Sequence, residues 1–168
     1  MLRITKAEDQ AVRLVMQLAT TGEQMTLGQL AEQEALPEPT VAKLLGLLRR
    51  GGVVEAIRGR HGGYVLARDP GDISAADVLR ALGGDPAPDH PCVEDPENGG
   101  GCPRTGDCGL RAVWRHLQLQ VAGLLEKTSV ADLLRVEASV DGRLHQLWPR
   151  EDGGPEIIDA KRAFSEGA

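Results

Sequence analysis

The sequence contains three cysteines, and all of them lie in one stretch rich in glycine and proline, with the spacing Cys92-x9-Cys102-x5-Cys108. Thiolates are soft ligands that suit an iron–sulfur cluster or zinc, and three in one loop could close on a single metal centre. The spacing differs from the paired Cys-x2-Cys of zinc ribbons. A redox pair, such as Cys102 with Cys108, is a third interpretation. The cysteines therefore predict a cluster, a zinc site or a thiol switch.

A metal held by three thiolates needs a fourth ligand. His90 lies two residues before Cys92, and His116 lies within a long helical pattern. Two carboxylates, Glu8 and Asp9, lie near the N-terminus. Spacing alone does not choose among these candidates.

The second chemical feature is a basic segment within an acidic protein. The net charge is −6, yet residues 39–68 contain six lysines and arginines against one acidic residue. Within it, Arg58 and Arg60 flank Gly59 in a glycine-rich turn that continues with His61. Guanidinium groups bind phosphate and enter minor grooves, and glycine lets the backbone approach DNA closely. This segment predicts contact with nucleic acid.

The elements that position these residues follow the order of a winged helix-turn-helix. Thr5 and Thr26 are typical N-caps and predict two helices that begin directly after them, and Ser74 predicts a further helix through Leu82. Pro39 suits the first turn of a third helix. Two β-prone runs at 53–58 and 64–67 enclose the glycine-rich turn and predict a hairpin. We therefore predict a mainly α fold with a small β-hairpin, as in a winged helix-turn-helix.

The third helix is the predicted recognition helix. It has short and polar side chains in its first turns and basic residues at its end, which a helix in the major groove requires. A core helix with solvated charges would look similar, and it is the following basic hairpin that favours DNA binding. The predicted contacts to double-stranded DNA are Glu38, Pro39, Thr40, Lys43, Arg49, Arg58, Arg60 and His61.

A long helix is predicted from Leu110 to Lys127, and Ser129 caps a shorter helix after it. The long helix is longer than a small winged domain needs. Pairing with a second copy would explain its length, and palindromic operators require such a dimer. The sequence thus predicts a dimerisation helix with one continuous apolar stripe, formed by Leu110, Val113, Trp114, Leu117, Val121, Leu124 and Leu125.

These elements predict four regions. Residues 1–82 form the winged helix-turn-helix DNA-binding domain and 83–109 the cysteine-bearing loop. Residues 110–140 hold the dimerisation helix and the helix after it, and 141–168 form a loosely ordered tail.

Several classes of protein are excluded or disfavoured. No apolar run has the length of a membrane span, and the N-terminus lacks the apolar stretch of a signal peptide. We therefore expect a cytoplasmic protein without membrane contact. No catalytic triad, phosphate-binding loop or paired-carboxylate site is recognisable, so an enzyme is not expected.

The chain resembles the IscR/NsrR-type family of winged-helix iron–sulfur transcription regulators over residues 2–136. The matching pieces are spread along the whole of this range. They are Ile4-Thr5-Lys6-x-x-Asp9, Leu30-Ala31, Leu48-Arg49-Arg50-Gly51-Gly52-Val53-Val54, Arg58-Gly59-x-x-Gly62-Gly63-Tyr64-x-Leu66, Ile73-x-x-x-Asp77-Val78, the three cysteines, and Val130-Ala131-Asp132-Leu133.

The resemblance implies a homodimeric regulator, with a repressor role expected, in which three cysteines of one subunit hold each cluster. In the nitric-oxide-sensor branch the fourth ligand is a carboxylate from the partner's first helix, which matches Asp9. Glu8 is occupied as the capping-box residue, whereas Asp9 is available. The resemblance favours a 4Fe–4S cluster over a 2Fe–2S cluster, with nitric oxide, oxygen or iron–sulfur status as the signal. Arg111 stands where the cluster-biogenesis branch has a histidine ligand, so that scheme is excluded.

Two alternatives remain open at this point. A winged-helix regulator could carry zinc or a thiol switch in place of the cluster. A small iron–sulfur electron carrier is disfavoured, because a carrier has no use for a basic wing.

Overall fold

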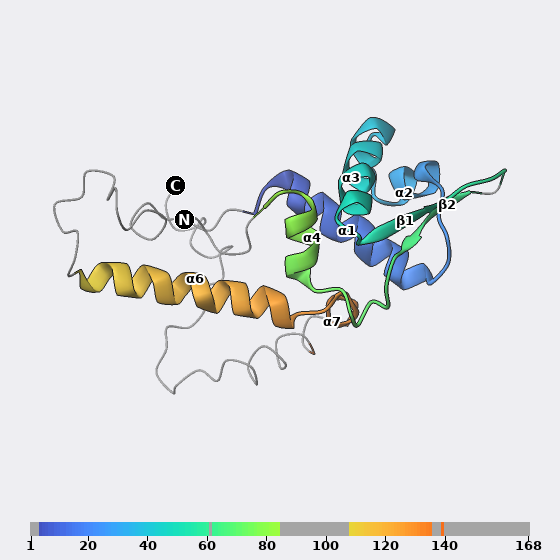
Figure 1. The fold of residues 1–168 in the computed structure, drawn as a ribbon. Helices are drawn as coiled ribbons and strands as arrows, with labels where there is room; N and C mark the ends of the chain where they lie inside the picture. Colours follow the sequence, from blue (N-terminus) through green and yellow to red (C-terminus); the bar gives the residue numbers. More distant parts are fainter. Residues whose placement is uncertain (1–3, 61, 85–107, 136–138, 140–168) are drawn as a thin grey trace, which may run out of the picture. The chain divides into compact units, whose positions relative to one another are not determined.

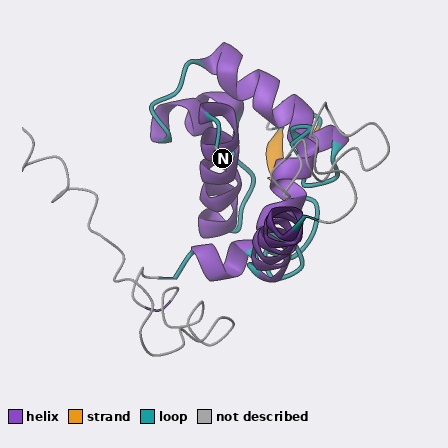
Figure 2. Cartoon of the chain, turned by 90° about the vertical axis from the view of Figure 1, so that its left-hand side faces the viewer, coloured by secondary structure: helices purple, strands orange, loops and turns teal. Residues whose placement is uncertain are grey.

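The structure is a computed structural model that describes residues 4–60, 62–84, 108–135 and 139 (Figure 1). Its helices are α1 (Lys6–Thr21), α2 (Leu27–Gln33), α3 (Glu38–Arg50), α4 (Ala75–Ala81), α6 (Gly109–Lys127) and α7 (Val130–Leu133). The strands β1 (Val54–Ile57) and β2 (Gly63–Leu66) pair antiparallel. Helices make up most of the described chain (Figure 2). The predicted helical fold with one hairpin is confirmed.

Capping boxes begin four of the helices. In each, a hydroxyl accepts the backbone N–H three residues later, and the side chain at that position accepts the N–H of the cap. These bonds satisfy amides that the helix itself leaves without partners. The pairs are Thr5 with Glu8, Thr26 with Gln29, Ser74 with Asp77 and Ser129 with Asp132, so the predicted caps are confirmed.

One hydrophobic core joins the elements of the winged domain. The apolar faces of α1 and α3 are fully buried through residues such as Leu14 and Leu45. Val53 and Val54, at the start of the hairpin, close the core on a third side. Because these side chains lie on single helix faces, the opposite faces of α1 and α3 are left to solvent.

Met25 pairs with β2 in the manner of a third strand and so holds the hairpin to the helices. Val54 pairs with Leu66, and Ile57 with Gly63. Met25, just before α2, exchanges two backbone hydrogen bonds with Tyr64, at 2.8 and 3.0 Å. A Cβ on Gly63 would lie 2.6 Å from the Met25 carbonyl oxygen. Only glycine therefore allows this close backbone approach.

The chain after α6 returns to the winged domain. The Val130 N–H donates to the Ile73 carbonyl at 2.8 Å, and the Ala75 N–H donates to the Thr128 carbonyl at 2.8 Å. The side chains of Ile73 and Val130 are both buried in the common core. The helix α7 is thus part of the same packed unit as α1.

The helix α6 packs on α4 and presents an apolar face that the described residues leave uncovered. Leu110, Val113 and Leu117 are 56%, 59% and 46% exposed. They lie at helical spacing on one face. None of the described helices is long and apolar enough to span a bilayer.

The packing of α3 against α4 yields a stability prediction. A Cβ on Gly51 would lie 2.4 Å from the Ala81 Cβ and 2.8 Å from the Ala81 Cα. We expect Gly51→Ala to lower the free energy of unfolding by about 1–3 kcal/mol, because a backbone must shift. Urea denaturation measures this change.

The matched control lies on the same helix. A Cβ on Gly46 meets nothing within 4 Å. Gly46→Ala should therefore raise the free energy of unfolding by about 0.5–1 kcal/mol, because it lowers the entropy of the unfolded chain. Equal effects of the two substitutions would contradict the close α3–α4 packing.

Candidate nucleic-acid interface

The predicted recognition residues lie at the start of α3. Val41, Leu44, Leu45 and Leu48 are buried and fix the helix against the core. The side turned away from that core carries the residues predicted to contact DNA. Glu38, Pro39 and Lys43 are exposed there, Thr40 is half-buried, and Arg49 is exposed in the last turn.

The predicted wing residues lie at the tip of the hairpin, which extends beyond the helices in Figure 1. Arg58 and Arg60 are exposed, and His61 lies outside the described residues. Gly59 has a φ of +133°, which a residue with a side chain rarely adopts. The Gly62 N–H donates to the Gly59 carbonyl at 3.0 Å and closes the turn. The glycines thus shape a tight tip that carries two guanidinium groups.

The structure brings two predicted DNA contacts from different elements together. Arg49 of α3 and Arg58, directly after β1, line one open groove of about 490 Å³, which Glu55 and Arg68 also line. Within the described chain, neither guanidinium forms an ion pair, whereas Arg13 pairs with Glu34 at 2.7 Å. Unpaired cations in one groove are suited to a phosphate backbone. Sequence reasoning named both residues but could not place them side by side.

The predicted metal ligands are only partly described. Cys92 and Cys102 lie outside the described residues. Cys108 is the half-buried N-cap of α6, and its side chain makes no capping hydrogen bond. No group of three or more metal-ligating side chains occurs within the part of the chain that the structure describes.

Glu8 takes part in the capping box of α1 and Asp9 does not, as the sequence predicted. Glu8 Oε2 accepts the Thr5 N–H at 2.6 Å, and the Glu8 N–H donates to the Thr5 hydroxyl at 3.2 Å. The Asp9 side chain is exposed in the first turn of α1 and has no hydrogen-bond partner among the described residues. Its carboxylate is therefore available to bind a ligand or a partner.

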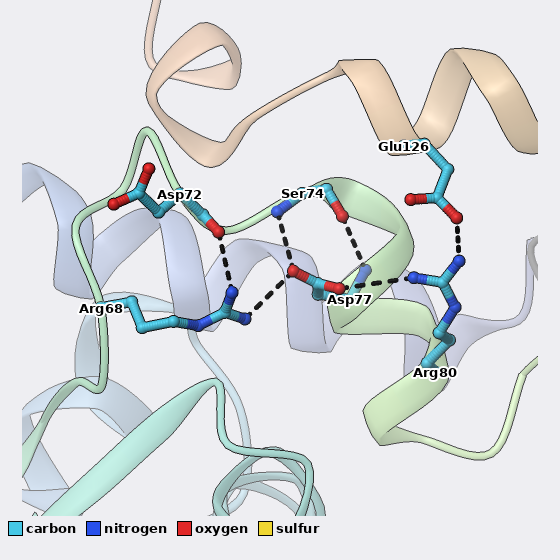
Figure 3. A network of polar contacts seen from close by, with 6 residues as sticks. All are labelled: Arg68, Asp72, Ser74, Asp77, Arg80 and Glu126. Atoms are coloured by element: carbon cyan, nitrogen blue, oxygen red, sulfur yellow. Dashed lines mark hydrogen bonds and ion pairs between the residues drawn. The ribbon is translucent and has the colours of Figure 1, made fainter.

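A network that sequence reasoning missed joins the wing to α4 (Figure 3). Arg68, just after β2, forms an ion pair with Asp77 at 3.0 Å and donates to the Asp72 carbonyl at 2.9 Å. The same Asp77 carboxylate caps α4 by accepting the Ser74 N–H at 3.2 Å. The basic segment predicted from the sequence therefore has one member, Arg68, that is neutralised internally.

The network continues from α4 to α6. Arg80 approaches the other oxygen of Asp77 at 3.4 Å and also pairs with Glu126. Asp77 in a capping box with Arg80 three residues later is a readable sequence signal. The contacts to Arg68 and Glu126 cross long sequence separations, which local patterns do not encode.

The environment of Asp77 lowers the pKa of its carboxyl group. Burial raises the pKa, but the Ser74 backbone hydrogen bond and the Arg68 hydrogen bond and charge outweigh it, with the charge of Arg80 adding to them. The net pKa is below the ordinary value of 3.8. The anionic form is therefore favoured in the folded protein.

The comparisons with known proteins agree with this geometry. The family model Rrf2, described as an iron-dependent transcriptional regulator, matches residues 4–136. An HTH-type transcriptional regulator of Mycobacterium tuberculosis is 35% identical over 136 residues, covering 79% of this chain and 81% of the relative. The HTH-type transcriptional regulator IscR of Klebsiella pneumoniae is 28% identical, covering 86% and 88% of the two chains.

Solved structures show the same architecture. CymR, the global cysteine regulator of B. subtilis, has a TM-score of 0.67 and 27% identity, covering 80% of this chain and 97% of CymR. IscR of T. potens has a TM-score of 0.61 and 27% identity, covering 79% and 86%.

Fold and interface thus define a winged-helix DNA-binding regulator. The chain belongs to the Rrf2 family of transcriptional regulators. Its relatives are named regulators and not enzymes, in agreement with the sequence prediction.

The network around Asp77 predicts a pH-dependent stability difference. Because the folded pKa lies below 3.8, the ionised carboxylate stabilises the fold fully above that pH and loses its effect as the pH falls through the folded pKa. Asp77→Asn should therefore lower the free energy of unfolding at neutral pH. The difference from the wild type should shrink as the pH falls below 3.8.

Asp72→Asn is the matched control, because Asp72 contributes its backbone carbonyl to Arg68 rather than its side chain. Urea denaturation across this pH range measures both variants. A constant difference for Asp77→Asn at every pH would contradict the role of its charge.

Proposed function

We propose that the protein is a cytoplasmic, homodimeric repressor whose operator binding is controlled by an iron–sulfur cluster. The family assignment and the winged-helix fold support DNA binding. The observation that supports control by a cluster is that Cys108 is the N-cap residue of α6. It places one predicted ligand directly at the start of the predicted dimerisation helix.

In the proposed complex, α3 enters the major groove of duplex DNA. Thr40 and Lys43, with Glu38 and Pro39 beside them, face the base edges and the adjacent backbone. The tip with Arg58, Arg60 and His61 contacts the neighbouring minor groove or its phosphates, and Arg49 binds backbone phosphate. The absence of ion pairs at Arg49 and Arg58 among the described residues supports these assignments.

The uncovered apolar face of α6 supports a homodimer. Leu110, Val113 and Leu117 follow helical spacing and are about half exposed. Burying a leucine or valine side chain contributes roughly 1.5–3 kcal/mol. A second copy of α6 crossing this face would bury the same residues on both subunits, as a twofold interface requires. Two winged domains would then face a palindromic operator.

The proposed cluster ligands are Cys92, Cys102 and Cys108 of one subunit and Asp9 of the partner subunit. The donor set fits, since thiolates suit iron–sulfur clusters and the exposed Asp9 carboxylate is uncommitted. The N-terminus of α6 attracts the negative charge of a thiolate-bound centre. The family description as iron-dependent also supports iron. We propose the 4Fe–4S form, as in the nitric-oxide-sensor branch.

When bound, the cluster would supply a redox-active centre that nitric oxide or oxygen can attack. Around it, Cys108 would anchor the loop to α6, and Asp9 would tie α1 of the partner subunit to that loop. Losing these tethers would shift the population of wing orientations. Glu126 and Arg80 connect α6 to α4, and Asp77 connects α4 to the wing.

The wing assignment predicts a specific change in DNA affinity. Arg58→Ala should weaken binding to a duplex that the protein has selected from a random pool. The slope of log K against log salt should fall by about 1, because one phosphate contact is lost. Fluorescence anisotropy at several salt concentrations measures both. Arg115→Ala on α6 is the control, and an unchanged affinity and slope for Arg58→Ala would count against the wing.

The ligand assignment predicts that Cys102→Ala abolishes the visible absorbance of the anaerobically prepared protein. The far-UV circular dichroism should stay unchanged, because the core of the winged domain contains residues of other segments, such as Leu14 and Leu45. A variant that keeps the full visible absorbance would rule out Cys102 as a ligand.

Mixed dimers test whether Asp9 acts across the subunit interface. Cys102→Ala and Asp9→Ala subunits, refolded together, should regain one complete site for each mixed dimer. That site would combine the cysteines of the second variant with Asp9 of the first. No gain over the separate variants would place Asp9 outside the partner's ligand set.

A further inference from the structure

Arg111 lies in the first turn of α6, three residues after the N-cap Cys108. Its backbone N–H donates to the Cys108 carbonyl at 3.1 Å. In a capping box, the side chains at these two positions lie close enough to bond to each other's backbone. The side chain of a helical residue also leans back toward the N-terminus of its helix. The guanidinium of Arg111 is therefore placed on the side of α6 at which Cys108 enters.

The Nε atom of Arg111 is buried and has no hydrogen-bond partner. Within the described residues, it is the one buried side-chain nitrogen or oxygen atom that is left in this way. A buried charged donor without an acceptor is unfavourable, because it has lost its bond to water without gaining another. The Nε–H therefore calls for an acceptor that the described residues do not provide.

The charges at the start of α6 show that this acceptor is an anion. In the four capping boxes, the residue three positions after the cap is an acceptor, such as Glu8 in α1 or Asp77 in α4. In α6 the same position holds Arg111, and the first turn contains no acidic residue. The free amides at a helix start carry partial positive charge, which repels a guanidinium. An anionic group would offset both positive charges.

We propose that Arg111 donates from Nε to a sulfur atom of the proposed cluster and so sets the reduction potential of that centre. This inference rests on the proposed function, in which Cys108 is a ligand. A centre with thiolate and carboxylate ligands is negatively charged, and hydrogen bonds to its sulfur atoms and its net charge tune its potential. The Nε–H and the positive charge favour the reduced form, which holds one more electron. Arg111 thereby raises the potential.

The reduction potential of the full-length protein with its cluster tests this role. It is measured by anaerobic titration with dithionite, followed by the electron paramagnetic resonance of the reduced centre. We expect Arg111→Met to lower the equilibrium constant for one-electron reduction about tenfold, because a charge-assisted bond is lost. This change is a negative shift of about 59 mV. Arg111→Lys keeps the charge and should recover part of the shift.

Arg111→Gln is a second neutral variant, for use if Arg111→Met does not fold, and should show the same negative shift. Arg115→Met is the matched control, since Arg115 is exposed one turn further along α6, and it should keep the wild-type potential. Iron and sulfide in the wild type are measured first, and their absence would contradict the proposed function together with this inference. A wild-type cluster whose potential is unchanged in the neutral Arg111 variants, or is shifted equally by Arg115→Met, would overturn the role of Arg111 alone.

Discussion

The short segment between β2 and α4 is the junction on which the rest of the structure depends. Its backbone pairs with the chain after α6, and its Arg68 side chain, directly after β2, binds Asp77 of α4. Apolar burial and ion pairs contribute differently to the stability of this junction. Burial of Ile73 and Val130 contributes roughly 1.5–3 kcal/mol for each side chain, whereas an exposed ion pair such as Arg80 with Glu126 contributes about 1 kcal/mol or less. Apolar burial therefore holds the junction together, and the ion pairs at Asp77 fix its geometry.

This junction divides the basic residues into two groups. Arg68 and Arg80 are used internally to connect β2, α4 and α6. Arg49 and Arg58 are left unpaired within the described chain and meet in one groove. An overall acidic protein thus keeps a local basic face for nucleic acid. The same elements that orient that face also lead to α6, which begins directly after Cys108.

Much of the fold could be predicted from local signals. Four helix starts could be predicted from capping residues, whose hydrogen bonds reach only three residues along the chain. These residues are Thr5, Thr26, Ser74 and Ser129. The hairpin followed from two β-prone runs around glycines. Contacts between distant segments could not be predicted in this way. The pairing of Arg68 with Asp77, and the groove that gathers residues of separate elements, depend on tertiary packing. Of the cysteines, Cys108 alone lies among the described residues, so the ligand set stays a prediction.

The iron and sulfide content of the anaerobically purified protein, with its visible spectrum, tests the central claim most directly. We expect about four irons and four sulfides for each chain, with one broad absorption band at about 400 nm. Colourless protein that contains zinc, or that takes up no metal after anaerobic reconstitution, would contradict it. The chain would then be an Rrf2-family DNA-binding protein whose cysteines serve another chemistry.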